Sequence, residues 1–402
     1  MKPVPSDGDD TLTRAPTSRL VGVDVARTLA LVGMMSVHIL PEFDARGGVT
    51  LAFVVSAGRS AALFALLAGV GLSLATGGQT PRLRPRRAVA AAVLTRAGLV
   101  ALIGLVLGTL SPPVAVILTN YGMLFVVALA VLALRPKVLL PLAAVWVVLT
   151  PLLSHALRAD LPRGPGAQPS LLLLAEPVEL IRALALTGYY PVLQWTAYVM
   201  VGVAVGRLAL SSARTSARLV AVGLTLAVGS RIVSDQLLAR GGLAALRAAS
   251  PPELVPAGPA GAAIDRLQLV GQFGVPPTTT WWWQSVASPH TATPFDLAQT
   301  IGSALVVLGL TLLLAQVVNR VPLLRGPLTV LAAPGSMTLT LYTVHVVALV
   351  AKIGPDSRPQ LLLAHVVAAA VLATIWRSRF GRGPLEELVS RAAASSARSS
   401  TH

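Results

Sequence analysis

Apolar runs long enough to cross a lipid bilayer recur along this chain. A helix needs about 20 apolar residues to span the hydrocarbon core, where only helices and closed barrels satisfy all their backbone hydrogen bonds. The candidate spans lie near residues 20–40, 50–75, 88–110, 113–134, 137–156, 189–210, 216–238, 296–318, 328–351 and 359–376. The pattern predicts an all-α, polytopic integral membrane bundle of about ten transmembrane helices.

Composition supports this class and excludes others. Of the 402 residues 54% are hydrophobic and only 12% are charged, which is too apolar for a soluble protein of this size. The net charge is +16, but the basic residues form short clusters without interleaved aromatics, which argues against nucleic acid as a partner. Cysteine is absent, so disulfides and a cysteine nucleophile are excluded. The bias toward arginine, alanine, leucine and valine is typical of a high-GC bacterium.

Basic residues indicate the orientation. When the connections are assigned alternately to the two sides, one side holds most of the 32 lysines and arginines, and cytoplasmic loops are the ones enriched in them. We therefore expect a multi-pass protein of the plasma membrane with both termini cytoplasmic. Residues 1–18 are predicted as a disordered cytoplasmic N-terminus, 19–376 as the bundle, and 377–402 as a cytoplasmic basic tail.

Two long external segments follow from this orientation, at 157–188 and 239–295. Within the first, residues 170–187 are leucine-rich but interrupted by charges and proline, so we predict a re-entrant or interfacial helix rather than a span. Within the second, the triplet Trp281–Trp283 is predicted to mark the outer membrane interface, where tryptophan is enriched.

The first span carries three ionisable residues. At about 100° per residue Arg27 and His38 lie almost in line, and Asp24 falls within about 60° of both. Each ionisable group at bilayer depth costs about 2.5–3.5 kcal/mol, so this face is predicted to line a hydrophilic path across the bundle. The structural alternative is an Asp24–Arg27 pair that only holds helices together.

Histidines suggest a site on the outer side. Apart from His402, all of them fall in or near the outer half of the membrane under this orientation. Histidine is the side chain best suited to proton transfer near neutral pH, and His38 and His290 are our catalytic candidates. His345 shares a helical face with Tyr342, and both are predicted as supporting residues. The remaining two, His155 and His365, are interpreted as packing or interface residues.

Metal and hydrolase chemistry lack motifs. No HExxH or paired-histidine spacing is present, so no metal site is expected, and no G-x-S-x-G elbow occurs.

Buried arginines on the cytoplasmic side indicate a second site. Arg27 and Arg96 each lie about two turns inside a span, and a guanidinium pairs bidentately with phosphate, so the two are predicted to bind a polyanion such as a nucleotide pyrophosphate. The Arg82–Arg87 cluster nearby is read as an orientation signal. Arg231 and Asp235 are predicted to form an intrahelical pair.

Several ordered motifs resemble one family. They are Arg19–His38 in the first span, Phe64–Gly71, Leu118–Phe125, Leu186–Pro191 leading to Gly206-Arg207, Ser288–Phe295, Gly335–Tyr342 and Arg382–Glu386. Together they resemble the YeiB-like and heparan-α-glucosaminide N-acetyltransferase-like transmembrane acyltransferases. The resemblance implies transfer of an acyl group, typically acetyl, from cytoplasmic acyl-CoA to an acceptor on the far side of the membrane. Within these motifs Asp24, Asn120 and Tyr121 are counted as supporting residues.

The sequence thus predicts a membrane-embedded acyltransferase. Acetyl-CoA or another acyl-CoA is the expected co-substrate, with its phosphates near Arg27 and Arg96, and the acceptor is a glycan, an amino sugar or a lipid. His38 would act as general base or carry the acyl group briefly. Two alternatives remain open, a transporter of a small anionic metabolite and a non-catalytic envelope-assembly protein. A homodimer through lipid-facing Gly98, Gly104 and Gly108 is a weaker expectation.

Overall fold

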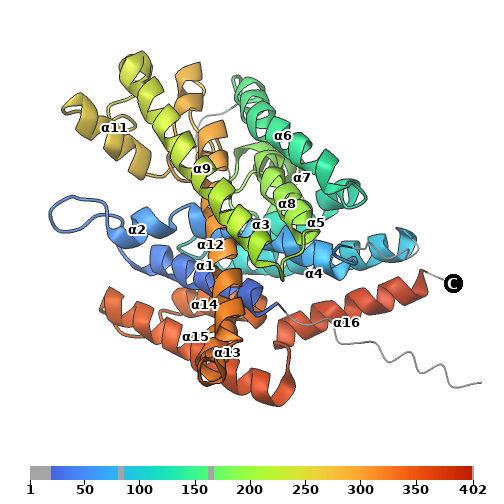
Figure 1. The fold of residues 1–402 in the computed structure, drawn as a ribbon. Coiled ribbons are helices and arrows are strands. Elements are labelled where there is room, and N and C mark those ends of the chain that lie inside the picture. Colours follow the sequence, from blue (N-terminus) through green and yellow to red (C-terminus); the bar gives the residue numbers. More distant parts are fainter. Residues whose placement is uncertain (1–19, 80–85, 162–166, 401–402) are drawn as a thin grey trace, which may run out of the picture.

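The computed structural model describes residues 20–79, 86–161 and 167–400, and this part of the chain is helical throughout, with a single isolated β-bridge between Phe43 and Val49. The main helices are α1 (Val21–Ile39), α2 (Leu51–Ser56), α3 (Arg59–Ala75), α4 (Arg86–Thr109), α5 (Leu118–Val131), α6 (Pro136–Leu157), α8 (Val192–Gly206), α9 (Ala213–Leu237), α12 (Pro294–Val318), α13 (Arg325–Ala332), α14 (Thr338–Val350), α15 (Arg358–Phe380) and α16 (Pro384–Ser399). Figure 1 shows them gathered into one bundle.

The predicted membrane bundle is confirmed. Among the described residues seven helical segments are long and apolar enough to cross a bilayer, and the shorter apolar helices α5, α8 and α14 fall on the remaining predicted spans. Outward-facing apolar side chains such as Val145, Val222 and Leu363 are exposed, as expected of a surface that lipid covers. The predicted N-terminal segment 1–18 lies outside the described residues.

Small residues let the central helices approach closely. On α8, a Cβ added to Gly202 would lie 2.1 Å from the backbone oxygen of Leu66 on α3, and one at Gly69 would lie 2.5 Å from the backbone oxygen of Val199. A backbone oxygen cannot rotate away as a side chain can, so α3 and α8 need glycine at this crossing.

Two predicted spans are broken rather than continuous. The span expected over 50–75 is interrupted between α2 and α3, where Gly58 takes φ +69°, a conformation that glycine adopts without penalty. The span expected over 328–351 is divided into α13, a 3₁₀ turn at Pro334–Ser336 and α14. In that turn the N–H of Gly335 donates to Thr28 Oγ1 of α1 at 2.8 Å. Both breaks expose backbone groups beside the cavities described below.

Residues 170–187 form only short pieces. A 3₁₀ turn (Leu172–Ala175), α7 (Pro177–Arg182) and a π-helical turn (Ala183–Thr187) follow one another, and none is long enough to cross a membrane. Leu172 and Val178 are exposed on this segment. These lengths agree with a segment that does not span, and the re-entrant or interfacial helix stays a prediction.

The second long segment folds into a small cap with its own core. It contains α10 (Leu243–Ala249), α11 (Ala260–Leu269) and a 3₁₀ turn at Trp281–Ser285. Trp283 is fully buried there, and its Nε1–H lies 3.2 Å from the hydroxyls of Ser250 and Thr279. The interfacial prediction is therefore wrong for Trp283, because the cap supplies both an apolar core and polar partners for the indole.

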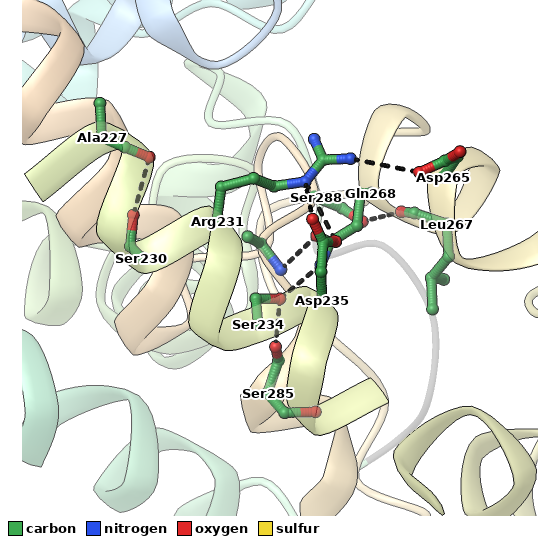
Figure 2. A network of polar contacts seen from close by, with 11 residues as sticks. Ala227, Ser230, Arg231, Ser234, Asp235, Asp265, Leu267, Gln268, Ser285 and Ser288 are labelled. Atoms are coloured by element: carbon green, nitrogen blue, oxygen red, sulfur yellow. Dashed lines mark hydrogen bonds and ion pairs between the residues drawn. The ribbon is translucent and has the colours of Figure 1, made fainter. Parts of the chain in front are cut away.

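Polar contacts join this cap to α9. Figure 2 shows Arg231, whose Nε lies 3.0 Å from Asp235, with Asp265 of α11 at 3.8 Å from its Nη2. The predicted Arg231–Asp235 pair is confirmed. In the same view Ser234 donates to the backbone oxygen of Ser285 and accepts from Gln268 Nε2.

The basic C-terminal segment is ordered as α16. It packs along α4 and touches α14 (Figure 1). The carboxylate of Glu386 accepts from the N–H groups of Leu339 and Thr340 at 2.7 and 3.2 Å and from the Thr340 hydroxyl at 2.6 Å. Glu386 thereby caps the first turn of α14 from another helix.

The glycines proposed for a dimer do not share one lipid-facing surface. A Cβ at Gly104 would lie 2.3 Å from the backbone nitrogen of Thr119, and one at Gly108 would lie 2.0 Å from the backbone oxygen of Pro169. Only Gly98 of the three is exposed. The prediction that Gly104 and Gly108 face lipid is wrong, since both are used for packing within the chain.

Candidate functional site

Two cavities enter the bundle at opposite ends of α1. The first, the Arg27 cavity, has a volume of about 320 Å³ and is lined by side chains of α1, α3, α4, α5, α14 and α16, including Arg27, Arg96, Tyr121, Tyr342 and Glu386. The second, the His38 cavity, is larger, at about 720 Å³, and its lining includes His38, Asn120, Tyr189, Tyr190 and His290. Those sequence-predicted site residues that line a cavity are thus divided between the two.

Arginine dominates the Arg27 cavity. Arg27 Nη1 lies 3.3 Å from Asp24 Oδ1, so the pair foreseen from the sequence is formed, and Asp24 itself is buried. The other end of the guanidinium lies over Gly71, where an added Cβ would come within 2.9 Å of Nη2. Arg96 of α4 lines the same cavity, near enough for Arg27 and Arg382 to repel it. Such a concentration of guanidinium groups fits an anion with several phosphates.

The hydrophilic path predicted along α1 is interrupted. Met34, one turn before His38, lines both cavities and so forms part of the wall between them. The prediction of one continuous vestibule from Arg27 to His38 is wrong, because an apolar side chain fills the middle of the helical face. The two cavities still meet at this single residue, and methionine is the most adaptable of the large apolar side chains.

His290 lies in the His38 cavity on a strained loop before α12. Its φ is +56° and that of Ala292 is +48°, values that L-residues rarely adopt. The N–H of Gly58 donates to His290 Nε2 at 3.1 Å, and the ring packs 4.5 Å from the ring of Tyr189. The backbone break between α2 and α3 therefore supplies the hydrogen bond that orients this histidine.

The hydrogen bond from Gly58 fixes the chemistry of His290. A nitrogen that accepts from a backbone N–H carries no proton, so the proton of the neutral ring is on Nδ1. That Nδ1 is buried and has no partner among the described residues. Burial, with a smaller contribution from nearby His38, lowers the pKa of His290 from 6.5 to about 3, so the ring stays neutral. His290 is therefore a neutral ring whose remaining donor, Nδ1–H, is left without an acceptor among the described residues.

Asp296 holds the His290 loop in place. Its Oδ2 accepts from the N–H groups of Thr291 at 3.1 Å and Ala292 at 2.9 Å, and Thr293 caps α12 by accepting from Asp296 N–H. Arg59 of α3 lies close enough to attract this carboxylate. The sequence prediction assigned neither residue to the site, although a threonine followed three residues later by an acid, as in Thr293 and Asp296, is a helix-start signal.

His38 is joined to two further histidines. Its Nδ1 lies 3.1 Å from Nε2 of His345 on α14, and Nδ1 of His345 lies 2.8 Å from Nδ1 of His365 on α15. His345 was expected to support His38, and the structure brings the two together. His365 was interpreted as a packing residue, and no local pattern marks it, because its partner comes from another helix. His155 does pack, against Gln284 and Trp281.

The other supporting candidates have structural partners. Asn120 Nδ2 donates to the backbone oxygen of Tyr190 at 2.9 Å, beside the His38 cavity. Tyr121 donates to the backbone oxygen of Ala61 at 3.3 Å and faces the Arg27 cavity. Tyr342 also lines the Arg27 cavity, so it lies on the opposite side of the wall from His38. His345 contacts His38 instead, so the joint role predicted for Tyr342 and His345 stays a prediction.

Fold and cavities define a polytopic membrane protein with separate chambers at its two ends. A family model described as heparan-alpha-glucosaminide N-acetyltransferase, catalytic, matches residues 19–234, and one described as a protein of unknown function (DUF418) matches residues 261–395. No curated protein matches the chain. The chain belongs to the heparan-α-glucosaminide N-acetyltransferase catalytic family, a family of membrane acetyltransferases, and the resemblance seen in the sequence is confirmed.

Both matches contribute to the site. Arg27, His38 and Arg96 lie in the first matched region, whereas His290 and His345 lie in the second. The His38 cavity is therefore built only when the two regions fold together.

Proposed function

We propose that this protein transfers an acyl group, acetyl in the simplest case, from cytoplasmic acyl-CoA to a glycan, amino sugar or lipid outside the plasma membrane. The donor binds in the Arg27 cavity, with its phosphates on Arg27 and Arg96. The acceptor binds in the His38 cavity. The observation that carries the proposal is that Met34 belongs to both linings, so the two substrates can meet at one point within the bundle.

The distances along α1 support this arrangement. Arg27 and His38 are eleven residues apart, which corresponds to about 16 Å of helix. An extended pantetheine arm is long enough to cover that separation. A donor with its phosphates at Arg27 can therefore bring its thioester to Met34. A shift of the Met34 side chain would then admit the acyl carbon to the His38 cavity.

His38 and His290 have complementary roles in the reaction. His38 takes the proton of the acceptor hydroxyl or amine as it attacks the thioester carbon. The Nδ1–H of His290 donates to the oxygen on which negative charge develops, as an oxyanion-hole donor does. The C–S bond breaks, the electron pair stays on sulfur, and the thiol is restored when that sulfur takes a proton.

Acetyl transfer in reconstituted vesicles tests this function. Labelled acetyl-CoA is supplied at one face and a mixture of extracted glycans and lipids at the other, and labelled product is counted. We expect His38→Ala to reduce transfer by about 10²- to 10⁴-fold, and His290→Ala by about 10²-fold or more. Equal transfer by the wild type and both variants would end the assignment.

Donor binding separates the enzyme from the alternatives. Calorimetry with acetyl-CoA is expected to show binding that weakens by about 10- to 100-fold on Arg27→Ala or Arg96→Ala, because each removes a charge-assisted contact. Arg231→Ala is the matched control, since Arg231 pairs with Asp235 away from both cavities. No binding of acetyl-CoA, together with uptake of a small anion, would favour the transporter.

A further inference from the structure

Three histidines from three helices form a continuous line that begins in the His38 cavity. His38 comes from α1, His345 from α14 and His365 from α15, and His38 and His345 are 307 residues apart in the chain. The rings of His38 and His345 stack at 5.4 Å, and those of His345 and His365 meet edge to face at 4.9 Å. Each adjacent pair is joined by one nitrogen-to-nitrogen hydrogen bond.

His345 gives the line a direction. Both of its nitrogens are engaged, one with His38 and the other with His365. A neutral imidazole has one N–H and one lone pair, so if His345 accepts from His38 it must donate to His365, and the reverse also holds. All three rings therefore share one of two tautomeric arrangements. In one of them His38 donates through Nδ1 and its Nε2 lone pair is free for chemistry.

The line passes through a buried ring, with a partly buried ring at each end. His345 is buried, whereas His365 is only partly covered, in the second turn of α15. The nitrogens face one another in sequence rather than converging on a point, an arrangement suited to passing protons and not to chelation. Among the described residues, no group of three or more metal-binding side chains has a geometry suited to a metal ion.

Few charged groups surround the line. His290 faces His38 across the cavity, and the backbone carbonyl of Ile353 contacts His365. Lys352, Asp356 and Arg358 are exposed in or next to the turn between α14 and α15. The charges of α1 lie about 16 Å or more from His38 along that helix.

We propose that His345 and His365 are relay residues that carry protons between His38 and the solution at the acceptor side. This inference rests on the proposed function. When the acceptor attacks, its proton goes to His38 Nε2, the Nδ1 proton of His38 goes to His345, the Nδ1 proton of His345 goes to His365, and His365 releases its Nε2 proton to water. The acyl C–O or C–N bond forms while the C–S bond breaks.

The second half of the cycle reverses the relay. The three rings are left in the opposite tautomeric arrangement, with a proton on His38 Nε2. That proton goes to the sulfur of the departing coenzyme A, His365 takes one proton from the same solution, and the starting arrangement returns. The relay gains and loses one proton per turnover, so atoms and charge balance, and no imidazolium need persist at His38.

Kinetics of relay variants in the vesicle assay test this inference. We expect His365→Ala to lower kcat by about 10²-fold with little change in KM, because substrates do not touch this ring. Imidazole added at the acceptor side should restore much of the rate, since His365 contacts Ile353 in the exposed turn between α14 and α15. His345→Gln should lower kcat similarly but resist rescue, because its site is buried. His155→Ala is the matched control and should match the wild type.

The outcomes separate this inference from the function on which it rests. If His38→Ala abolishes transfer but His365→Ala retains a kcat within twofold of wild type, the relay is overturned and the acyltransferase stands. A slow His365→Ala enzyme that imidazole does not rescue, with an unchanged response to pH at the acceptor side, assigns only a structural role and also overturns the relay. If the wild type transfers no acetyl group, both proposals fall.

Discussion

Replacing Asp296 by asparagine should loosen the loop that presents His290. The carboxylate accepts two backbone N–H groups, from Thr291 and Ala292. Hydrogen bonds to a charged group contribute about 1.5–3 kcal/mol each, against about 0.5–1.5 kcal/mol for neutral ones. The substitution keeps the shape of the side chain and removes its charge, so it should weaken the loop by about 2–3 kcal/mol.

That loss is large compared with the margin by which these hydrogen bonds outweigh the backbone strain of the loop. His290 and Ala292 both have positive φ, and each such residue costs about 1–2 kcal/mol. With two neutral hydrogen bonds in place of two charged ones, the support no longer exceeds the strain. The loop should then open, and His290 should leave its contact with Gly58.

Hydrogen exchange measures this directly. In Asp296→Asn the amides of Thr291 and Ala292 should exchange about 30- to 150-fold faster, since each 1.36 kcal/mol corresponds to a factor of ten. Acetyl transfer should fall by a comparable factor. Asp235→Asn, which removes an acid of α9 that pairs with Arg231 rather than with the amides of Thr291 and Ala292, is the control. Unchanged protection of both amides in Asp296→Asn would refute the reasoning.

Three further predictions concern stability, each measured by unfolding in detergent. Glu386→Ala should destabilise the protein by about 2–4 kcal/mol, because two N–H groups of α14 lose their acceptor. Glu386→Gln should recover part of this stability, and an unchanged stability in Glu386→Ala would contradict the capping role. Gly202→Ala should lower the unfolding temperature, since its Cβ meets the backbone of Leu66, whereas Gly229→Ala, which meets nothing within 4 Å, should not. The pKa of His290 is 6.5 in the unfolded chain and about 3 in the folded protein, so between these values only the unfolded chain binds the proton. The free energy of unfolding should therefore decrease as the pH is lowered from 6.5 to about 3, and it should decrease less steeply in His290→Gln.

Features encoded locally were predictable from the sequence. Apolar run length located the spans, and helical periodicity placed Asp24 beside Arg27 and Arg231 beside Asp235. Each of these depends only on spacing within one helix. The placement of Arg27 and His38 in two cavities along α1 follows from the same spacing.

Features formed between distant segments were not predictable. His365 has its partner on another helix, and Glu386 caps a helix that begins 48 residues earlier in the chain. The break at Gly58 depends on a close approach of the His290 loop, which spacing cannot show. Met34 reads as one more apolar residue of the first span, and its place in the wall emerges only when α3, α5 and α14 surround it.

Met34 also concentrates any electrical potential. If water enters both cavities, most of a transmembrane voltage falls across the thin layer at this side chain rather than across about 30 Å of hydrocarbon. Moving one elementary charge through that layer involves about 2.3 kcal/mol per 100 mV. A neutral acetyl group would cross this layer without such work, so the proposed transfer step should be insensitive to the membrane voltage, whereas the passage of an ionised group through the same layer should depend on it.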